Sequence, residues 1–204
     1  MIFLNSEDSQ IALNFQKHLI MISISNERFD LKHTGGGAMI KMMTRNDLNQ
    51  FKQLIDDVRR IETEPNSHES FLQLELTSED IDAFFHPVHQ NRAVLFGAFD
   101  NEKLVGFIHL NYNLQLTKRH KAVVECLYVI PQYRNEDIAQ QLLEALIRYA
   151  KENGIENIML SVASNNIAAK IFYDNFGFEF LALEEKARKI DNRYIEDHWL
   201  IYYT

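Results

Sequence analysis

The alternation of apolar and polar positions predicts a series of strands and helices over most of the chain. Strands are predicted at 39–42, 92–99, 104–112, 122–129, 155–162, 178–183 and 194–203, where apolar residues alternate with polar ones or run together between turn residues. Helices are predicted near 47–60, at 78–85, at 138–150 and at 166–176, where apolar residues recur every three or four positions. Interleaved strands and helices indicate an α/β fold, with a mixed sheet covered by helices on both faces.

The segment that follows the strand at 122–129 has the form of an anion-binding turn. The residues from Ile130 to Ala139 lead directly into the helix at 138–150, and Gly154 ends that helix. The first turn of a helix leaves backbone N–H groups without intrahelical partners, at the positive end of the helix dipole. Phosphate is the usual ligand of such an end.

A second motif follows the next strand. Asn166, Ala169 and Tyr173 are spaced along one helix, which ends in Gly177–Phe178. Together with the turn, this motif resembles the GNAT superfamily of N-acetyltransferases. The acyl-CoA site of that family has an Arg/Gln-x-x-Gly-x-Gly/Ala turn, then a strand, then Asn-x-x-Ala-x-x-x-Tyr ending in Gly-Phe. The resemblance covers roughly residues 39–204.

The resemblance implies a fold, an activity and a cosubstrate. The implied fold is a mixed, mostly antiparallel sheet with a central V-shaped splay between two parallel strands. The implied activity is acetyl transfer from acetyl-CoA to a primary amine, by direct attack in a ternary complex. The positions that match the family's acetyl-CoA site are Leu127, Tyr128 and Val129 on the strand, Arg134, Asn135, Glu136, Asp137, Ile138 and Ala139 in the turn, and Asn166, Ala169 and Tyr173 on the later helix.

Two of the matched positions carry catalytic expectations. Tyr173 takes the family's role of proton donor to the leaving thiolate; the alternative is a core tyrosine with a satisfied hydroxyl. Glu125 matches a frequent position of the general base, which removes the amine proton through water. Strand alternation places Glu125 on the side of Leu127 and Val129, and a carboxylate there requires a polar cleft.

The same alternation turns Cys126 to the opposite face of the sheet, which predicts a buried structural thiol. The histidines His86, His89, His109 and His120 lack metal-ligand spacing, so they are interpreted as ordinary surface or cleft residues and no metal is expected.

Asp137 departs from the family pattern, because it stands where the turn usually has glycine. A missing side chain lets pyrophosphate approach the backbone amides. The Asp137 carboxylate either repels phosphate, by roughly a kcal/mol at an intermediate dielectric, or bonds the helix's own N–H groups and fills the site itself. The second functional hypothesis follows from this departure: a catalytically weak GNAT-like module that senses CoA or binds a protein.

The composition of the chain limits the classes of partner that it is expected to bind. The net charge of −8 argues against a nucleic-acid partner, and no run of about 20 apolar residues suggests a membrane helix. A single cysteine fits a reducing compartment, so a cytoplasmic protein is expected. Acidic residues at Asp56, Asp57, Glu62 and Glu64 favour a cationic acceptor such as a polyamine; the alternative is that they form a solvated face. A homodimer is left open.

Three consecutive glycines, Gly35 to Gly37, divide the chain. Residues 1–38 form an N-terminal extension of unknown role, and 39–204 form the acetyltransferase domain. Two alternatives remain for the extension: it packs on the domain or on a partner, or the native start is Met39.

Overall fold

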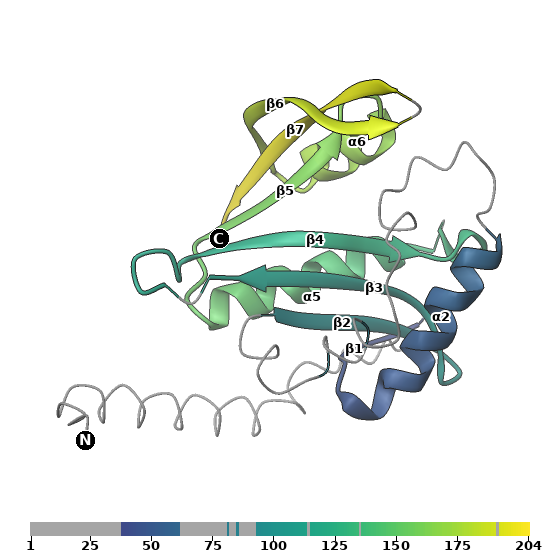
Figure 1. The fold of residues 1–204 in the computed structure, drawn as a ribbon. Coiled ribbons are helices and arrows are strands. Elements are labelled where there is room, and N and C mark those ends of the chain that lie inside the picture. Colours follow the sequence, from purple (N-terminus) through teal and green to yellow (C-terminus); the bar gives the residue numbers. More distant parts are fainter. Residues whose placement is uncertain are drawn as a thin grey trace, which may run out of the picture.

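The computed structural model describes residues 38–61, 81, 85, 93–113, 115–134, 136–190 and 192–204 (Figure 1). Its elements are β1 (Met39–Met42), η2 (Arg45–Asp47), α2 (Leu48–Ile61), β2 (Ala93–Asp100), β3 (Lys103–Tyr112), β4 (Lys121–Val129), η3 (Pro131–Tyr133), α5 (Ile138–Glu152), β5 (Asn157–Ala163), α6 (Ile167–Asn175), β6 (Glu179–Ile190) and β7 (Arg193–Tyr203). The N-terminal extension and most of the helix predicted at 78–85 lie outside the described residues.

The strands form one seven-stranded sheet in the order β1-β2-β3-β4-β5-β7-β6. Every neighbouring pair is antiparallel except β4 and β5, which are parallel. The connection between β4 and β5 contains α5, as a crossover between parallel strands requires. The mixed, mostly antiparallel sheet predicted from the sequence is therefore confirmed.

The two parallel strands separate soon after they meet. Pairing between β4 and β5 covers only three positions in the described chain, from Lys121 with Asn157 to Val123 with Met159. Beyond Val123 the strands diverge, and Figure 1 shows β5, β6 and β7 turned away from β4. The predicted V-shaped splay is thus present, and it opens toward the C-terminal end of β4.

Helices cover both faces of the sheet because the strands beneath them bury apolar side chains on both sides. On one face, the α2 residue Phe51 meets Phe107 of β3 with ring centroids 4.9 Å apart. On the other, Tyr149 of α5 meets Phe96 of β2 at 5.8 Å. Thr44 accepts a hydrogen bond from the Asn46 N–H and caps the short 3-10 helix η2 that leads into α2.

The final hairpin differs from its prediction. β6 continues to Ile190, seven residues past the predicted end, because its polar second half pairs with β7. The register shifts between Glu184 and Arg188, where Lys186 adopts a left-handed conformation with φ of 56°. Beyond this irregularity Arg188 donates to both carboxylate oxygens of buried Asp197, at 2.6 and 2.9 Å, which joins the two strands.

Candidate active site

The turn after β4 presents the start of α5 as an open helix end. The first α5 hydrogen bond from a described donor runs from the Gln141 N–H to the Asp137 carbonyl, at 3.0 Å. The N–H groups of residues 138–140 therefore project from the end of the helix. Ile138 itself is buried in the core and Ala139 is half-buried, so their backbones rather than their side chains face this end.

Asp137 occupies a left-handed conformation, with φ of 56° and ψ of 13°. This is the conformation that favours glycine, which accounts for the family's preference at the matched position. The exposed Asp137 side chain makes no capping hydrogen bond to the α5 backbone. The alternative in which the carboxylate bonds the helix's own N–H groups is therefore wrong.

The other turn residues are fixed by contacts with the sheet. The Arg134 Nε donates to the Val129 carbonyl at 3.0 Å, and its guanidinium lies 5.8 Å from the Tyr128 ring centroid. The Tyr133 hydroxyl donates to Asp100 at 2.6 Å and ties the turn to the β2–β3 hairpin. Glu136 is exposed, and Asn135 lies outside the described residues.

The helix α6 carries the second motif at its predicted place. The Asn166 side chain accepts a hydrogen bond from the Ala169 N–H at 3.1 Å, so it caps the helix. The Tyr173 ring is buried against Phe172 and Phe178, with centroids 5.1 and 5.4 Å away. Desolvation raises the pKa of Tyr173 well above its ordinary value, with a smaller electrostatic contribution from Cys126. Its hydroxyl is therefore protonated at neutral pH.

Glu125 is the extra residue of a β-bulge in β4. His109 of β3 pairs with Cys126 and the next residue, Leu110, pairs with Val124, which leaves Glu125 between them without a cross-strand partner. The Glu125 side chain is exposed, Leu127 is half-buried and Val129 is buried. The Glu125 carboxylate is therefore exposed to solvent, in agreement with the polar surroundings expected for it.

The bulge also bears on the prediction for Cys126, which is buried as expected. Val124 and Cys126 pair with the adjacent β3 residues Leu110 and His109, so strict alternation does not hold across the extra residue. Tyr173, in the helix after β5, is close enough to Cys126 for the thiol to contribute to its raised pKa, which brings Tyr173 near β4 where β4 and β5 have separated.

His109 is also buried, contrary to the surface or cleft position expected. Desolvation lowers its pKa to about 4, so its imidazole is neutral at physiological pH. His120 is half-buried, and His86 and His89 lie outside the described residues. Within the described chain no three His, Cys, Asp or Glu side chains gather into a potential metal site.

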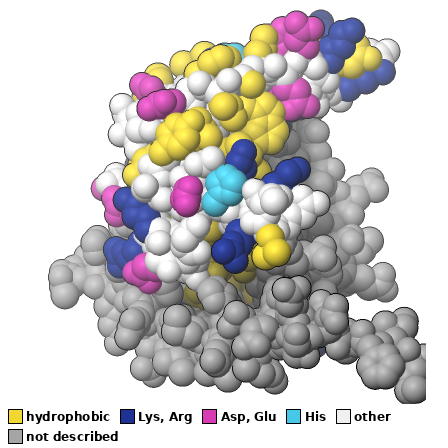
Figure 2. Space-filling model, turned by 90° about the vertical axis from the view of Figure 1, so that its left-hand side faces the viewer, with side chains coloured by type: hydrophobic (Ala, Val, Ile, Leu, Met, Phe, Trp, Pro, Cys, Tyr) yellow, Lys and Arg dark blue, Asp and Glu magenta, His cyan; other side chains and the backbone are white. Residues whose placement is uncertain are grey.

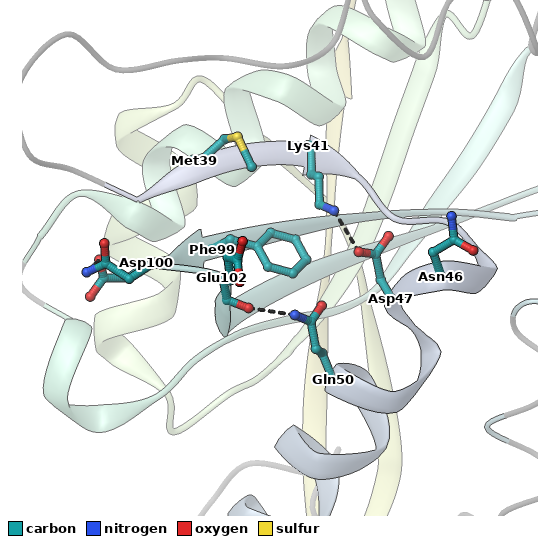
Figure 3. A pocket seen from close by; sticks show the side chains of 9 residues that line it. Met39, Lys41, Asn46, Asp47, Gln50, Phe99, Asp100 and Glu102 are labelled. Atoms are coloured by element: carbon teal, nitrogen blue, oxygen red, sulfur yellow. Dashed lines mark hydrogen bonds and ion pairs between the residues drawn. The ribbon is translucent and has the colours of Figure 1, made fainter.

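Two depressions of the described surface bear on the search for a site. The larger, about 640 Å³, is lined by β1, the start of α2 and the β2–β3 turn, and it contains none of the predicted site residues. Figure 3 shows its side chains, with Lys41 paired to Asp47 and Gln50 donating to the Glu102 carbonyl, both at 2.6 Å. These internal bonds already satisfy much of its polar surface.

The smaller depression, about 400 Å³, contains Glu125. It lies where β4 and β5 still pair, and its other lining residues come from the end of β3, the β3–β4 loop and the starts of β4 and β5: Asn111, Tyr112, Asn113, Lys118, Lys121, Ala122, Val123 and Met159. Sequence reasoning missed Lys118 and Lys121 as site residues.

Comparison with known proteins identifies the family. The model of the acetyltransferase (GNAT) domain matches residues 40–199. The chain belongs to the GNAT acetyltransferase family. The recognition of a GNAT N-acetyltransferase from sequence is confirmed, and the fold described above is the fold of this family.

Similar proteins agree with this assignment. N-alpha-acetyltransferase 30 of Schizosaccharomyces pombe is 29% identical over 91 residues, which is 45% of this chain and 61% of that protein. An uncharacterized N-acetyltransferase of Methanocaldococcus jannaschii is 35% identical over 81 residues, 39% of this chain and 36% of that protein. The matched region therefore spans less than two thirds of either curated relative.

A solved structure covers more of the GNAT domain. The crystal structure of a probable acetyltransferase from Staphylococcus epidermidis superimposes with a TM-score of 0.69 at 32% identity, over 81% of this chain and 98% of that one. Among the described residues of this GNAT protein, no helix combines the length and apolar character needed to cross a bilayer.

Proposed function

We propose that this protein transfers the acetyl group of acetyl-CoA to a primary amine of a small molecule or peptide, by direct attack within a ternary complex. The observation that carries the proposal is the separation of β4 from β5, which leaves Tyr173 beside β4 and Glu125 exposed on the same strand. The GNAT domain occupies residues 39–204 in this proposal, and the single cysteine supports a cytoplasmic location.

The residues present fit acetyl-CoA. The N–H groups at the start of α5 suit its pyrophosphate, and the left-handed backbone at Asp137 opens that turn. The edge of β4 from Leu127 to Val129, no longer covered by β5, offers backbone groups to the pantetheine arm. A fold neighbour, Arabidopsis thaliana NAA60, has been crystallised with acetyl-CoA; it is 17% identical over 81% of this chain, with a TM-score of 0.60.

Each catalytic role follows from the environment of its side chain. Acetyl-CoA supplies the thioester carbonyl that the amine attacks. Glu125 accepts the amine proton, directly or through one water, because its carboxylate is exposed in the depression where an acceptor can enter. Tyr173 donates a proton toward the sulfur, because burial keeps its hydroxyl protonated.

A second function, that of a CoA-sensing or protein-binding module without turnover, is favoured by one observation. The exposed Asp137 carboxylate stands at the helix end that would receive the pyrophosphate. Like charges within a few ångströms weaken binding, so a site of this kind can lose acetyl-CoA while keeping the fold.

The substitution Tyr173→Phe tests the proposal. It should leave acetyl-CoA affinity within about twofold and lower kcat at least tenfold, the lower range for loss of an acid catalyst. Affinity is measured by calorimetry and kcat by release of the CoA thiol. Tyr202→Phe is the matched control, because Tyr202 packs against Phe178 at 5.3 Å, as Tyr173 does at 5.4 Å.

The outcomes separate the two functions. An unchanged kcat in Tyr173→Phe would remove this residue from the mechanism. A wild-type protein whose melting temperature does not rise with acetyl-CoA would exclude the acetyltransferase, since a ligand that binds only the folded state stabilises it. The binding-module alternative would then remain.

A further inference from the structure

The depression around Glu125 contains two lysines that the proposed reaction does not use. Lys118 lies in the β3–β4 loop and Lys121 begins β4, and both line the same surface as Glu125. Figure 2 views the end of the molecule that carries this loop, where Lys and Arg side chains lie around a histidine with Asp and Glu side chains among them. In a chain of net charge −8, this depression is locally positive.

Neither lysine is neutralised within the described part of the chain. No described carboxylate lies within ion-pair distance of either ammonium group. The amide side chains of Asn111 and Asn113 add neutral hydrogen-bonding groups to the same depression. Two unneutralised cations beside hydrogen-bonding amides provide an environment that favours an anion.

The loop that holds the lysines is fixed by backbone hydrogen bonds. The backbone N–H of Lys118 donates to the Gln115 carbonyl at 2.8 Å, and the backbone N–H of Lys121 donates to the Lys118 carbonyl at 3.0 Å. The His120 carbonyl accepts from both Glu156 and Asn157, at 2.8 and 3.0 Å, which joins the loop to the start of β5. A fixed loop places the charges without a large ordering cost when a ligand binds.

The spacing along β4 sets the size of the ligand. Lys121 and Glu125 are four residues apart, which corresponds to at most about 13 Å between their Cα atoms at the usual strand rise, because the bulge at Glu125 shortens the strand. Because both side chains reach into one depression, an anion at the lysines lies on the order of 10 Å from the carboxylate. An extended peptide covers that distance in about three residues.

We infer that the acceptor is a peptide whose N-terminal amine is followed, at the second or third position, by an acidic side chain. The amine lies at Glu125 and the acidic side chain lies between Lys118 and Lys121. The inference rests on the proposed function, because it places the acceptor amine at Glu125. It narrows the acceptor to an anionic one and replaces the cationic acceptor expected from the sequence. Two of the four acidic residues that supported the cationic acceptor, Glu62 and Glu64, lie outside the described residues.

The experiment compares three tetrapeptides with free N-termini and amidated C-termini: Ala-Glu-Ala-Ala, the same peptide with Gln at the second position, and the same peptide with Lys there. A second set moves the variable residue to the third position. Initial rates of CoA release give kcat/KM for the wild type, for Lys118→Ala/Lys121→Ala and for Lys103→Ala. Lys103 is an exposed lysine of the β2–β3 hairpin, which lines neither depression.

The wild type should acetylate the Glu peptide of at least one set about tenfold more efficiently than its Gln counterpart, mainly through a lower KM. The double variant should lose this preference and keep its rate on the Gln peptide, and Lys103→Ala should keep both. Raising the salt concentration to 0.5 M should reduce the preference in the wild type, because exposed charges are screened.

Two results would overturn the inference while leaving the proposed function intact. One is equal efficiency on the Glu, Gln and Lys peptides. The other is a preference for Glu that survives in the double variant. A wild-type protein that binds no acetyl-CoA in calorimetry would instead overturn the proposed function, and the inference with it. Equal melting temperatures of the three proteins would show that the substitutions act on binding rather than on folding.

Discussion

Replacement of Asp137 tests both the backbone and the charge of the phosphate turn. The left-handed conformation costs an L residue about 1 kcal/mol, and glycine avoids that cost. Glycine also raises the entropy of the unfolded chain, by about 0.4–1 kcal/mol. Because Asp137 makes no capping hydrogen bond, Asp137→Gly should change the free energy of unfolding by no more than about 0.5 kcal/mol. A capping role for this carboxylate, one of the two alternatives that the sequence leaves open, would instead make Asp137→Gly destabilising.

Asp137→Ala tests the left-handed backbone separately from the charge. Alanine removes the carboxylate but keeps the Cβ, so it bears the cost of the left-handed backbone. Because glycine has its own entropic cost, the alanine variant should be less stable than the glycine variant by up to about 0.6 kcal/mol. Urea denaturation measures the three proteins on one scale. An alanine variant that is clearly more stable than the glycine variant would refute the left-handed conformation at this position.

The charge should act on CoA. At about 6 Å and an effective dielectric constant of about 40, one carboxylate repels one phosphate charge by about 1.4 kcal/mol, a tenfold change in affinity. Asp137→Asn removes the charge, keeps the size and tolerates the left-handed backbone. It should bind CoA about tenfold more tightly in calorimetry, and pantetheine, which lacks the pyrophosphate, with unchanged affinity. Equal CoA affinity in the wild type and the Asn variant would show that the carboxylate points away from the phosphates.

Two further predictions concern the sheet. A Cβ at Gly106 would lie 2.8 Å from the Tyr128 carbonyl oxygen. Gly106→Ala should therefore lower the free energy of unfolding, measured by urea denaturation, by about 1–3 kcal/mol and weaken acetyl-CoA binding at the β4 edge. Unchanged values for both would contradict the close packing. His109 has a folded-state pKa of about 4, below its ordinary value, so the unfolded state takes up a proton first as the pH falls. The free energy of unfolding is therefore highest above about pH 6.5 and decreases as the pH falls toward 4. Between pH 7.5 and pH 5 the free energy of unfolding should fall by about 2 kcal/mol in the wild type. This decrease should be absent in His109→Gln and retained in His120→Gln. An equal pH dependence in all three proteins would exclude His109 as its source.

The parts of the fold that follow from local patterns could be predicted from the sequence. β4 and α5 lie within a residue or two of their predicted bounds, because their apolar positions keep the periods of a strand and a helix. The second half of β6 was missed, because a strand at the edge of a sheet can be polar on both faces and then carries no alternation.

The details of the candidate site depend on contacts between distant segments. The bulge at Glu125 requires the register with β3, which no pattern within β4 reveals. The association of Lys118 with Glu125 depends on how the β3–β4 loop returns to β5. Tyr173 could be selected from its family motif, whereas its burial and the electrostatic effect of Cys126 on its pKa emerge only from packing.

The short pairing between β4 and β5 has a consequence for the dynamics of the protein. In the part of the chain that the structure describes, sheet pairing joins β1–β4 to β5–β7 at three residue pairs, so the two groups of strands can act as separate cooperative units in amide hydrogen exchange. The amides of β5 and β7 should then exchange through partial openings that leave β2 and β3 protected. A cosubstrate that spans the splay would contact both units, and it should slow exchange in β5 and β7 more than in β2.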